Sequence, residues 1–292
     1  MRWRNPRRSG NIEDRRGMRV PMKVVGGGIG GLVLLIITLL LNGGDPGMIF
    51  NDNTNVGANN PGSSYNEGST TPISEEERQL ADFVSVVLAD TEDTWNEIFS
   101  AENLEYREPT LVLFSGAVES ACGFAQSAVG PFYCPVDEKV YIDLSFYRDL
   151  RDSYGAPGDF AQAYVIAHEV GHHVQNQIGI MEQVNSAQQQ ASSSQVDANR
   201  LSVLLELQAD CFAGVWAYNA DRARDILEQG DIEEGLNAAS SIGDDRLQME
   251  SQGQVTPDSF THGSSAQRVS WFERGVESGD INSCNTFEAM NS

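Results

Sequence analysis

The segment AYVIAHEVGHHVQ, residues 163–175, places three histidines and one glutamate in an otherwise largely apolar stretch. The chain has 292 residues and only four histidines, so this concentration needs a chemical explanation. An α-helix advances by about 100° per residue, which puts His168 and His172 on one face with Glu169 beside them. The apolar side chains fall on the opposite face, namely Phe160, Ala163, Ala167, Val170, Gly171, Val174 and Ile178. The segment therefore predicts a helix that packs on a core and presents two imidazoles and a carboxylate.

The letters from His168 to His172 form the HExxH arrangement. Two histidines one turn apart can both offer a nitrogen to a single Zn²⁺ ion. Glu169, between them, can take a proton from a zinc-activated water and pass it to a leaving amine. Ordinary helix histidines are the alternative, but the separation of the two faces favours a zinc site. His173 lies further round the helix, and we expect it to be a packing or surface histidine outside the site.

A catalytic zinc site needs a third protein ligand, and the segment LLELQADCFAGVW, residues 204–216, offers one. Glu206 and Asp210 are four residues apart and share one face of a predicted helix, with an apolar stripe behind them. We predict that Glu206 is the third zinc ligand. Asp210 is placed to accept the outer N–H of a ligating histidine. A solvated acidic pair is the alternative reading.

The fourth histidine, His262, lies in PDSFTHGSSAQRVSWF, residues 257–272, just before a predicted helix. Peptide hydrolysis needs a donor for the oxyanion of the tetrahedral intermediate, and a histidine or an arginine can provide it. His262 is therefore a candidate catalytic residue, with Arg268 one turn into the helix. A loop histidine with a structural hydrogen bond is the equal alternative.

The N-terminal part of the chain differs in composition from the rest. The chain has 19 basic and 42 acidic residues, yet residues 1–23 hold eight of the basic ones. The remainder is strongly acidic and should be repelled by phosphates, which excludes a nucleic-acid partner. Residues 24–44 carry no charge and would span about 30 Å as a helix, which predicts a single transmembrane signal anchor. A cleaved signal peptide and a buried core helix are the alternatives.

These features predict a single-pass protein of the cell membrane. The basic residues before the span place residues 1–23 in the cytoplasm by the positive-inside rule. Residues 45–72, rich in Gly, Asn, Ser and Pro, predict a flexible linker. Residues 73–292 would then form an extracytoplasmic domain, on the periplasmic side or at the cell exterior.

The four cysteines fit an oxidising compartment, since an even number can form two disulfides. Cys122 and Cys134 enclose a loop that a disulfide could close, which leaves Cys211 and Cys284 for a second pair. A zinc site made of these cysteines is a weaker alternative because the CxxC spacing is absent.

The expected fold is α+β and mainly helical, with a small sheet. Ser74 and Glu77 form a capping-box pattern before an amphipathic helix. Strands are predicted at residues 110–114 and 139–144. Further helices are predicted at residues 159–178, with Asp159 as N-cap and Gly179 after its end, and at residues 196–218, 221–229, 231–241 and 264–277.

The chain closely resembles the bacterial YpfJ-like family of neutral zinc metallopeptidases. The resemblance runs nearly end to end, through MRWR, EDRRG, TEDTW (91–95), GPFYCP (130–135), VYIDLSFY (140–147), residues 158–175, ELQADCFAGVW (206–216), IGDDRLQ (242–248) and DSFTHGSSAQR (258–268). It implies a zincin-like domain on a single-span anchor, with Glu206 as a zinc ligand and Asp210 supporting a zinc-bound histidine.

The resulting hypothesis is a membrane-anchored zinc endopeptidase that acts on proteins or peptides outside the cytoplasm. Two other functions stay open from the sequence. One is a non-enzymatic envelope protein that uses a zinc-bound zincin fold as a binding module. The other is a zinc amidase that acts on cell-wall peptides.

Overall fold

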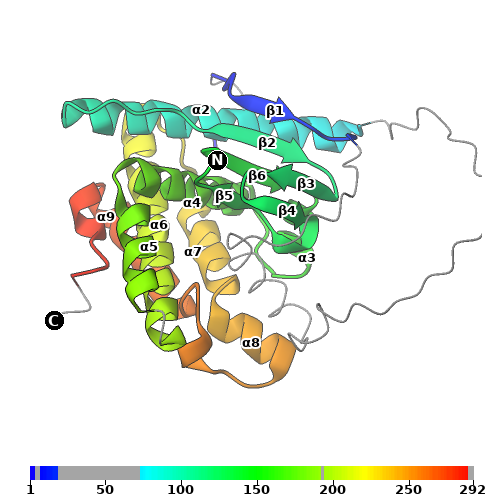
Figure 1. The fold of residues 1–292 in the computed structure, drawn as a ribbon. Helices are drawn as coiled ribbons and strands as arrows, with labels where there is room; N and C mark the ends of the chain where they lie inside the picture. Colours follow the sequence, from blue (N-terminus) through cyan, green and yellow to red (C-terminus); the bar gives the residue numbers. More distant parts are fainter. Residues whose placement is uncertain (4–6, 19–72, 192–193, 289–292) are drawn as a thin grey trace, which may run out of the picture.

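The structure is a computed structural model that describes residues 1–3, 7–18, 73–191 and 194–288 (Figure 1). Its strands are β1 (Ile12–Asp14), β2 (Thr110–Phe114), β3 (Ala117–Ser120), β4 (Gly123–Gln126), β5 (Phe132–Cys134) and β6 (Lys139–Asp143). Its α-helices are α2 (Glu75–Ala101), α3 (Phe146–Asp152), α4 (Asp159–Gln177), α5 (Ile180–Gln190), α6 (Gln195–Arg224), α7 (Asp231–Ser241), α8 (Asp244–Gln252) and α9 (Ser265–Ser278). Short 3₁₀ helices are η3 (Ser127–Val129), η4 (Pro257–Ser259) and η5 (Ile281–Cys284). The described fold is mainly helical α+β, as predicted.

The larger sheet has the strand order β1-β2-β6-β5. Strand β2 is parallel to both β1 and β6, whereas β5 is antiparallel to β6. Side chains alternate between the two faces of a strand, and both faces of β2 are buried. Leu111 and Leu113 pack into the helical core, while Val112 and Phe114 pack with residues of the β3–β4 hairpin. Burial on both faces explains why TLVLF reads as a continuous apolar run.

Helix α6 is central to the helical half of the molecule and crosses α9 at very short range. The crossing point is a pair of glycines, Gly214 on α6 and Gly275 on α9. A Cβ atom at Gly214 would lie 2.2 Å from the carbonyl oxygen of Phe272, and one at Gly275 would lie 2.1 Å from that of Cys211. Any larger residue at either position would push the two helices apart. The α6–α9 contact therefore depends on both glycines.

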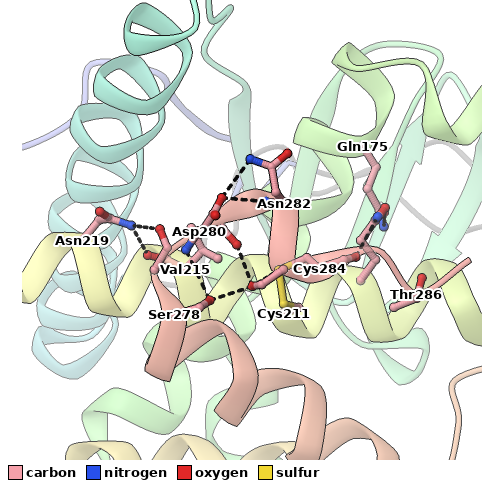
Figure 2. Close-up of a disulfide and its surroundings, with 12 residues drawn as sticks. Gln175, Cys211, Val215, Asn219, Ser278, Asp280, Asn282, Cys284 and Thr286 are labelled. Atoms are coloured by element: carbon pink, nitrogen blue, oxygen red, sulfur yellow. Dashed lines mark hydrogen bonds between the residues drawn. A yellow bond between two sulfur atoms is a disulfide. The ribbon is translucent and has the colours of Figure 1, made fainter. Parts of the chain in front are cut away.

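Two disulfides join the pairs of cysteines that the sequence suggested. Cys122, between β3 and β4, is bonded to Cys134 at the end of β5. Cys211 on α6 is bonded to Cys284 in η5, which ties the C-terminal segment to the central helix (Figure 2). Asn219 reinforces this junction by donating to the carbonyl oxygens of Val215 and Gly279. All four cysteines are thus paired.

Several predicted elements agree closely with the structure. The strand at 110–114 and the helix at 231–241 have the predicted bounds, and the capping box of Ser74 and Glu77 is present at the start of α2. The helix predicted at 221–229 is wrong, because α6 continues to Arg224 and Asp225 then adopts a left-handed conformation with φ of 53°. Helices α3, α5 and α8 were not predicted. They bury few apolar side chains, so their sequences carry a weak helical pattern.

The N-terminal residues differ most from the expected organisation. Within residues 1–23, which we expected to form a separate cytoplasmic segment, β1 pairs with β2 of the larger sheet. Backbone hydrogen bonds join β1 to β2, and arginines that precede β1 also pair with acids of α2. Across the described residues, no helix combines the length and the apolar character needed to cross a membrane. The predicted span, residues 24–44, and the predicted linker, residues 45–72, lie outside the described residues.

Candidate metal centre

Helix α4 carries three of the four histidines on a long buried segment. Its N-cap is Gly158, with φ of 123°, and not Asp159 as predicted. Asp159 is instead the first helical residue, where a carboxylate interacts favourably with the helix dipole. The helix ends at Gln177 with Ile178 as its C-cap, and Gly179 follows in the left-handed conformation that terminates many helices. Of the predicted apolar face, Ile178 alone is exposed, and its exposure is 36%.

Helix α6 packs against α4 at short range, where Gly171 on the apolar face lies next to the histidines. Gly171 makes this approach possible, because a Cβ atom there would lie 3.0 Å from the carbonyl oxygen of Ala209 and 3.2 Å from its Cα. Glu206 and Asp210 flank Ala209 on α6. The close contact therefore brings both acids to the imidazoles of His168 and His172.

Three side chains converge on one point between the two helices. His168 Nε2 lies 3.2 Å from Glu206 Oε2, and His172 Nε2 lies 3.5 Å from Glu206 Oε1. One ligand atom from each of the three residues lies within 4.8 Å of the others. Both histidines are buried, with 6% and 8% of the residue surface exposed. The three residues that the sequence suggested as metal ligands thus meet at one site.

The hydrogen bonds of these histidines fit a bound zinc ion. His168 Nδ1 lies 2.8 Å from Asp210 Oδ1, and His172 Nδ1 lies 2.8 Å from Gln175 Oε1. Both partners are acceptors, so each Nδ1 carries the proton and each neutral ring has its lone pair on Nε2. When neither ring holds a second proton, two lone pairs and a carboxylate face one another, and this arrangement favours a cation between them. Zinc prefers this set of imidazole and carboxylate ligands.

The raised pKa of His168 also indicates that this site favours a bound cation. Burial alone would lower it, but the carboxylates of Asp210 and Glu206 raise it to about 10. For Glu206, burial acts to raise the pKa, and His172 and His168 reverse this effect and hold the pKa well below its usual range. An electron-rich pocket that holds a proton so strongly can hold a metal ion in its place.

A second group of buried side chains fixes Asp210 behind His168. Arg268 on α9 donates from Nε to Asp210 Oδ2 and from Nη2 to Asp210 Oδ1, both at 2.9 Å. Tyr164, one turn before His168, donates its hydroxyl to Asp210 Oδ1. Burial would raise the pKa of Asp210, but Arg268 and His168 lower it to about 2. Arg268 therefore holds Asp210 in place. The sequence suggested Arg268 as a possible donor to the oxyanion, and the structure gives it this supporting contact instead.

A chain of amides supports the second histidine. Gln175, three residues after His172, accepts from its Nδ1 and donates to Gln208 Oε1 at 3.0 Å. Gln208 donates to the carbonyl oxygen of Cys284, also at 3.0 Å. In Figure 2, Gln175 lies on the same side as Cys284, the last residue of η5, and Thr286. The disulfide and the imidazole of His172 are thereby linked through three hydrogen bonds.

Glu169 is buried beside the three converging residues, with 8% of its surface exposed. Burial raises its pKa, although His168 and His172 act in the opposite direction. A carboxylate with a raised pKa is a stronger base than a solvated one, which suits proton transfer near neutral pH.

His262 is held by Asp244, the first residue of α8. His262 Nδ1 lies 3.1 Å from Asp244 Oδ1, and Asp244 Oδ2 accepts the backbone N–H of Thr261, His262 and Gly263. Burial would lower the pKa of His262, but Asp244 and the nearby Glu206 raise it. His262 therefore has the structural hydrogen bond that we considered, and it also lies within electrostatic range of the metal centre.

His173 is directed away from this site. Its Nδ1 lies 3.0 Å from the Tyr133 hydroxyl, and its ring packs edge-on to Tyr106 and Tyr133. The ring is fully buried, and burial lowers its pKa. His173 is a packing histidine, as expected.

Three supporting residues were missed by sequence reasoning. Tyr164 lies four residues before His168 and Gln175 three residues after His172, so helical spacing alone could have placed both beside the ligands. Asp244 is distant in sequence from His262, and no periodicity connects them. Only the fold brings Asp244 and His262 together.

Two histidines of an HExxH helix and a glutamate from a second helix define a metal centre of the zinc-peptidase class. Residues 1–287 match the family described as "Putative neutral zinc metallopeptidase". The chain is 52% identical to the uncharacterized protein YpfJ of Escherichia coli K12 over 98% of this chain and 99% of the relative. It is 45% identical to the uncharacterized protein Rv2575 of Mycobacterium tuberculosis, over 63% of this chain and 64% of that protein. No solved structure matches the chain.

The chain therefore belongs to the family of neutral zinc metallopeptidases. The cofactor of such a family is Zn²⁺, and its substrates are peptides or proteins. The donor set of His168, His172 and Glu206 fits that cofactor.

Proposed function

We propose that this protein is a zinc peptidase that hydrolyses peptide bonds with His168, His172 and Glu206 as the zinc ligands. The observation that carries the proposal is the convergence of one ligand atom each from His168, His172 and Glu206 within 4.8 Å, next to the buried Glu169, whose pKa is raised. The Glu206 carboxylate and the outer partners Asp210 and Gln175 set the histidine tautomers for this role.

Zinc bound at this position would act as a Lewis acid that polarises the peptide carbonyl and makes water acidic enough to lose a proton near pH 7. Glu169 accepts that proton as the water oxygen attacks the carbonyl carbon. When the tetrahedral intermediate collapses, the carbon–nitrogen bond breaks and Glu169 returns the proton to the leaving amine. The burial of Glu169 keeps its pKa high enough for both transfers.

His262 is proposed to stabilise the oxyanion of the intermediate. Asp244 occupies its Nδ1 and raises its pKa, so Nε2 is the nitrogen left to donate to a substrate. The three backbone bonds from residues 261–263 to Asp244 hold this loop against α8. His262 would thus be positioned before substrate binds.

We further propose that the domain acts outside the cytoplasm. Two disulfides among the described residues support this placement, because disulfides form and persist in oxidising compartments. The single-span anchor predicted at residues 24–44 concerns residues outside those that the structure describes, and it competes with the pairing of β1 with β2 in the domain sheet.

The proposal is tested with the full-length protein loaded with zinc, assayed on an unstructured protein such as casein. Wild type should cleave casein, and a chelator should abolish cleavage. Glu169→Gln should lower kcat/KM by at least about a thousandfold because the general base is lost. The same variant should bind one zinc per chain, since Glu169 is not among the three ligands.

The exposed Glu97→Gln on α2 is the matched control and should cleave at the wild-type rate. Zinc-loaded wild type that leaves casein and a broad peptide library intact would argue instead for a binding module with a structural zinc. Cleavage confined to cell-wall peptides would identify the amidase alternative.

A further inference from the structure

Residues 7–18, which we call the N-terminal arm, lie along the edge of the domain sheet (Figure 1). Strand β1 of the arm pairs in parallel with β2, with Ile12 opposite Leu111 and Asp14 opposite Leu113. The Leu111 amide donates to the Asn11 carbonyl at 2.8 Å, and the Arg15 amide donates to the Leu113 carbonyl at 2.8 Å. The sheet therefore takes its first strand from a segment far away in sequence.

A buried acid of the domain depends on the arm. Glu92, within TEDTW on α2, has none of its surface exposed. Its Oε2 accepts from Arg7 at 2.9 Å, and its Oε1 accepts from Asn11 at 2.8 Å and from the hydroxyl of Ser9. Among the described residues, every donor to this carboxylate belongs to the arm. Without the arm, a buried carboxylate would lose its partners, which is strongly unfavourable.

The basic residues of the arm are also paired within the domain. Arg7 contacts Asp93 at 2.8 Å, in addition to Glu92. Arg8 forms an ion pair with Asp82, and Arg16 donates to the carbonyl oxygen of Glu77 at 2.9 Å. Three of the positive charges that suggested a cytoplasmic location by the positive-inside rule, Arg7, Arg8 and Arg16, therefore have acidic or backbone partners on the domain itself.

We propose that the N-terminal arm is a permanent edge strand of the peptidase domain and that the arm and the domain occupy the same compartment. The arm ends at Met18, and the next described residue of the domain is Ile73. A single membrane crossing by residues 24–44 would put these two positions on opposite sides and would remove β1 from the sheet. An arm contributed by a second copy of the chain would obey the same rule, because it would still lie on the side of the domain to which it binds.

The test measures on which side of the membrane each part lies, using the full-length chain in bacterial spheroplasts. Met18→Cys marks the end of the arm and Met249→Cys marks α8, because both side chains are exposed, by 65% and 53%. Each introduced cysteine is the single free thiol, since the four native cysteines are in disulfides. A membrane-impermeant maleimide is added before and after permeabilisation.

We expect the two positions to label in the same step, both before or both after permeabilisation. Labelling of one position before and of the other only after permeabilisation would overturn the proposal. This outcome is independent of peptidase activity, so the test separates a failure of the topology from a failure of the proposed function.

A second measurement examines the strand pairing itself in full-length protein. Deuterium uptake at the Leu111 amide should be slow in membranes, because this amide donates to Asn11. Glu92→Gln should speed that uptake by at least about tenfold by weakening the contact with Arg7. Glu97→Gln, an exposed substitution on the same helix, should leave it unchanged. Rapid uptake in the wild type would show that the arm is not docked and would also overturn the proposal.

Discussion

Glu206 differs from the other acids of this acidic chain because two imidazole nitrogens face it in a buried site. We expect Glu206→Ala to lower the affinity for zinc by more than about a hundredfold, because removing a ligand should exceed the effect of losing an outer partner. Metal content after dialysis against a weak chelator measures this change.

His173→Ala is the informative comparison for Glu206→Ala. It removes a buried ring that contacts Tyr106 and Tyr133, so we expect it to lower the free energy of unfolding by about 1–3 kcal/mol. Zinc content should stay at one per chain. Loss of zinc from His173→Ala, with retention in Glu206→Ala, would contradict the ligand set.

Arg268 supports zinc binding by holding the carboxylate of Asp210 with two hydrogen bonds. Arg268→Met would leave a buried carboxylate beside His168 without its main counter-charge, and we expect zinc affinity to fall by about 10–100-fold. Competition with a chromophoric chelator gives the affinity. The control is Arg274→Met on the same helix, where the arginine is exposed and lies over Trp271. Equal zinc affinities of the two variants would exclude the supporting role of Arg268.

At the scale of elements, the sequence predicts those helices and strands whose burial follows a simple period. Helix α4 has segregated faces and β2 is a short apolar run, so both were placed to within about a residue. Helix α5 was missed because its exposed, glutamine-rich sequence buries only Met181 and Val184. Strand β1 could not be predicted from IED, because its position depends on a partner nearly a hundred residues away.

The same distinction applies to the metal centre. His168, Glu169 and His172 follow from spacing within one helix, and Glu206 with Asp210 follows from spacing within another. Pairing of the two helices depends on the fit of Gly171 against Ala209, and the Asp244–His262 contact joins the first residue of α8 to the loop before α9. Spacing can nominate side chains, but such contacts between elements are determined by packing in three dimensions.

At the scale of elements, we expect the two disulfides to differ in how much they contribute to the free energy of unfolding. In the chain-entropy model, a disulfide stabilises more when it closes a longer loop. The separation is 73 residues for Cys211–Cys284 and 12 for Cys122–Cys134. We expect Cys211→Ser with Cys284→Ser to lower the free energy of unfolding by about 4 kcal/mol, and the other double variant by about 3 kcal/mol. Urea denaturation measures both.

Loss of the Cys211–Cys284 disulfide should have a second effect, since Cys284 accepts from Gln208 in the chain of amides that ends at His172. Zinc affinity should fall in the Cys211/Cys284 variant and stay unchanged in the Cys122/Cys134 variant. Equal zinc affinities would show that the amide chain does not orient His172.

For the whole molecule, stability should couple to both pH and zinc through the buried metal centre. In the metal-free protein the folded-state pKa of His168 is about 10, above the value of about 6.5 expected when unfolded. The folded state then binds the extra proton, so its stabilising effect is complete below pH 6.5 and is lost as pH rises towards 10. The raised pKa of His262 acts in the same direction.

Zinc should reverse this alkaline loss of stability. A metal ion takes the place of the proton on His168, and its binding strengthens as pH rises because protons compete less for the ligands. We expect the metal-free protein to lose on the order of a few kcal/mol of unfolding free energy between pH 6.5 and 9.5, and the zinc-loaded protein to retain its stability. Urea denaturation at several pH values, with and without zinc, gives both curves.

Metal-free His168→Gln should show a much smaller dependence of unfolding free energy on pH than metal-free wild type, since the residue that binds the proton is absent. A flat curve for metal-free wild type would mean that His168 is not protonated in the folded protein at neutral pH. That result would contradict the argument that the site between His168 and Glu206 favours a bound cation.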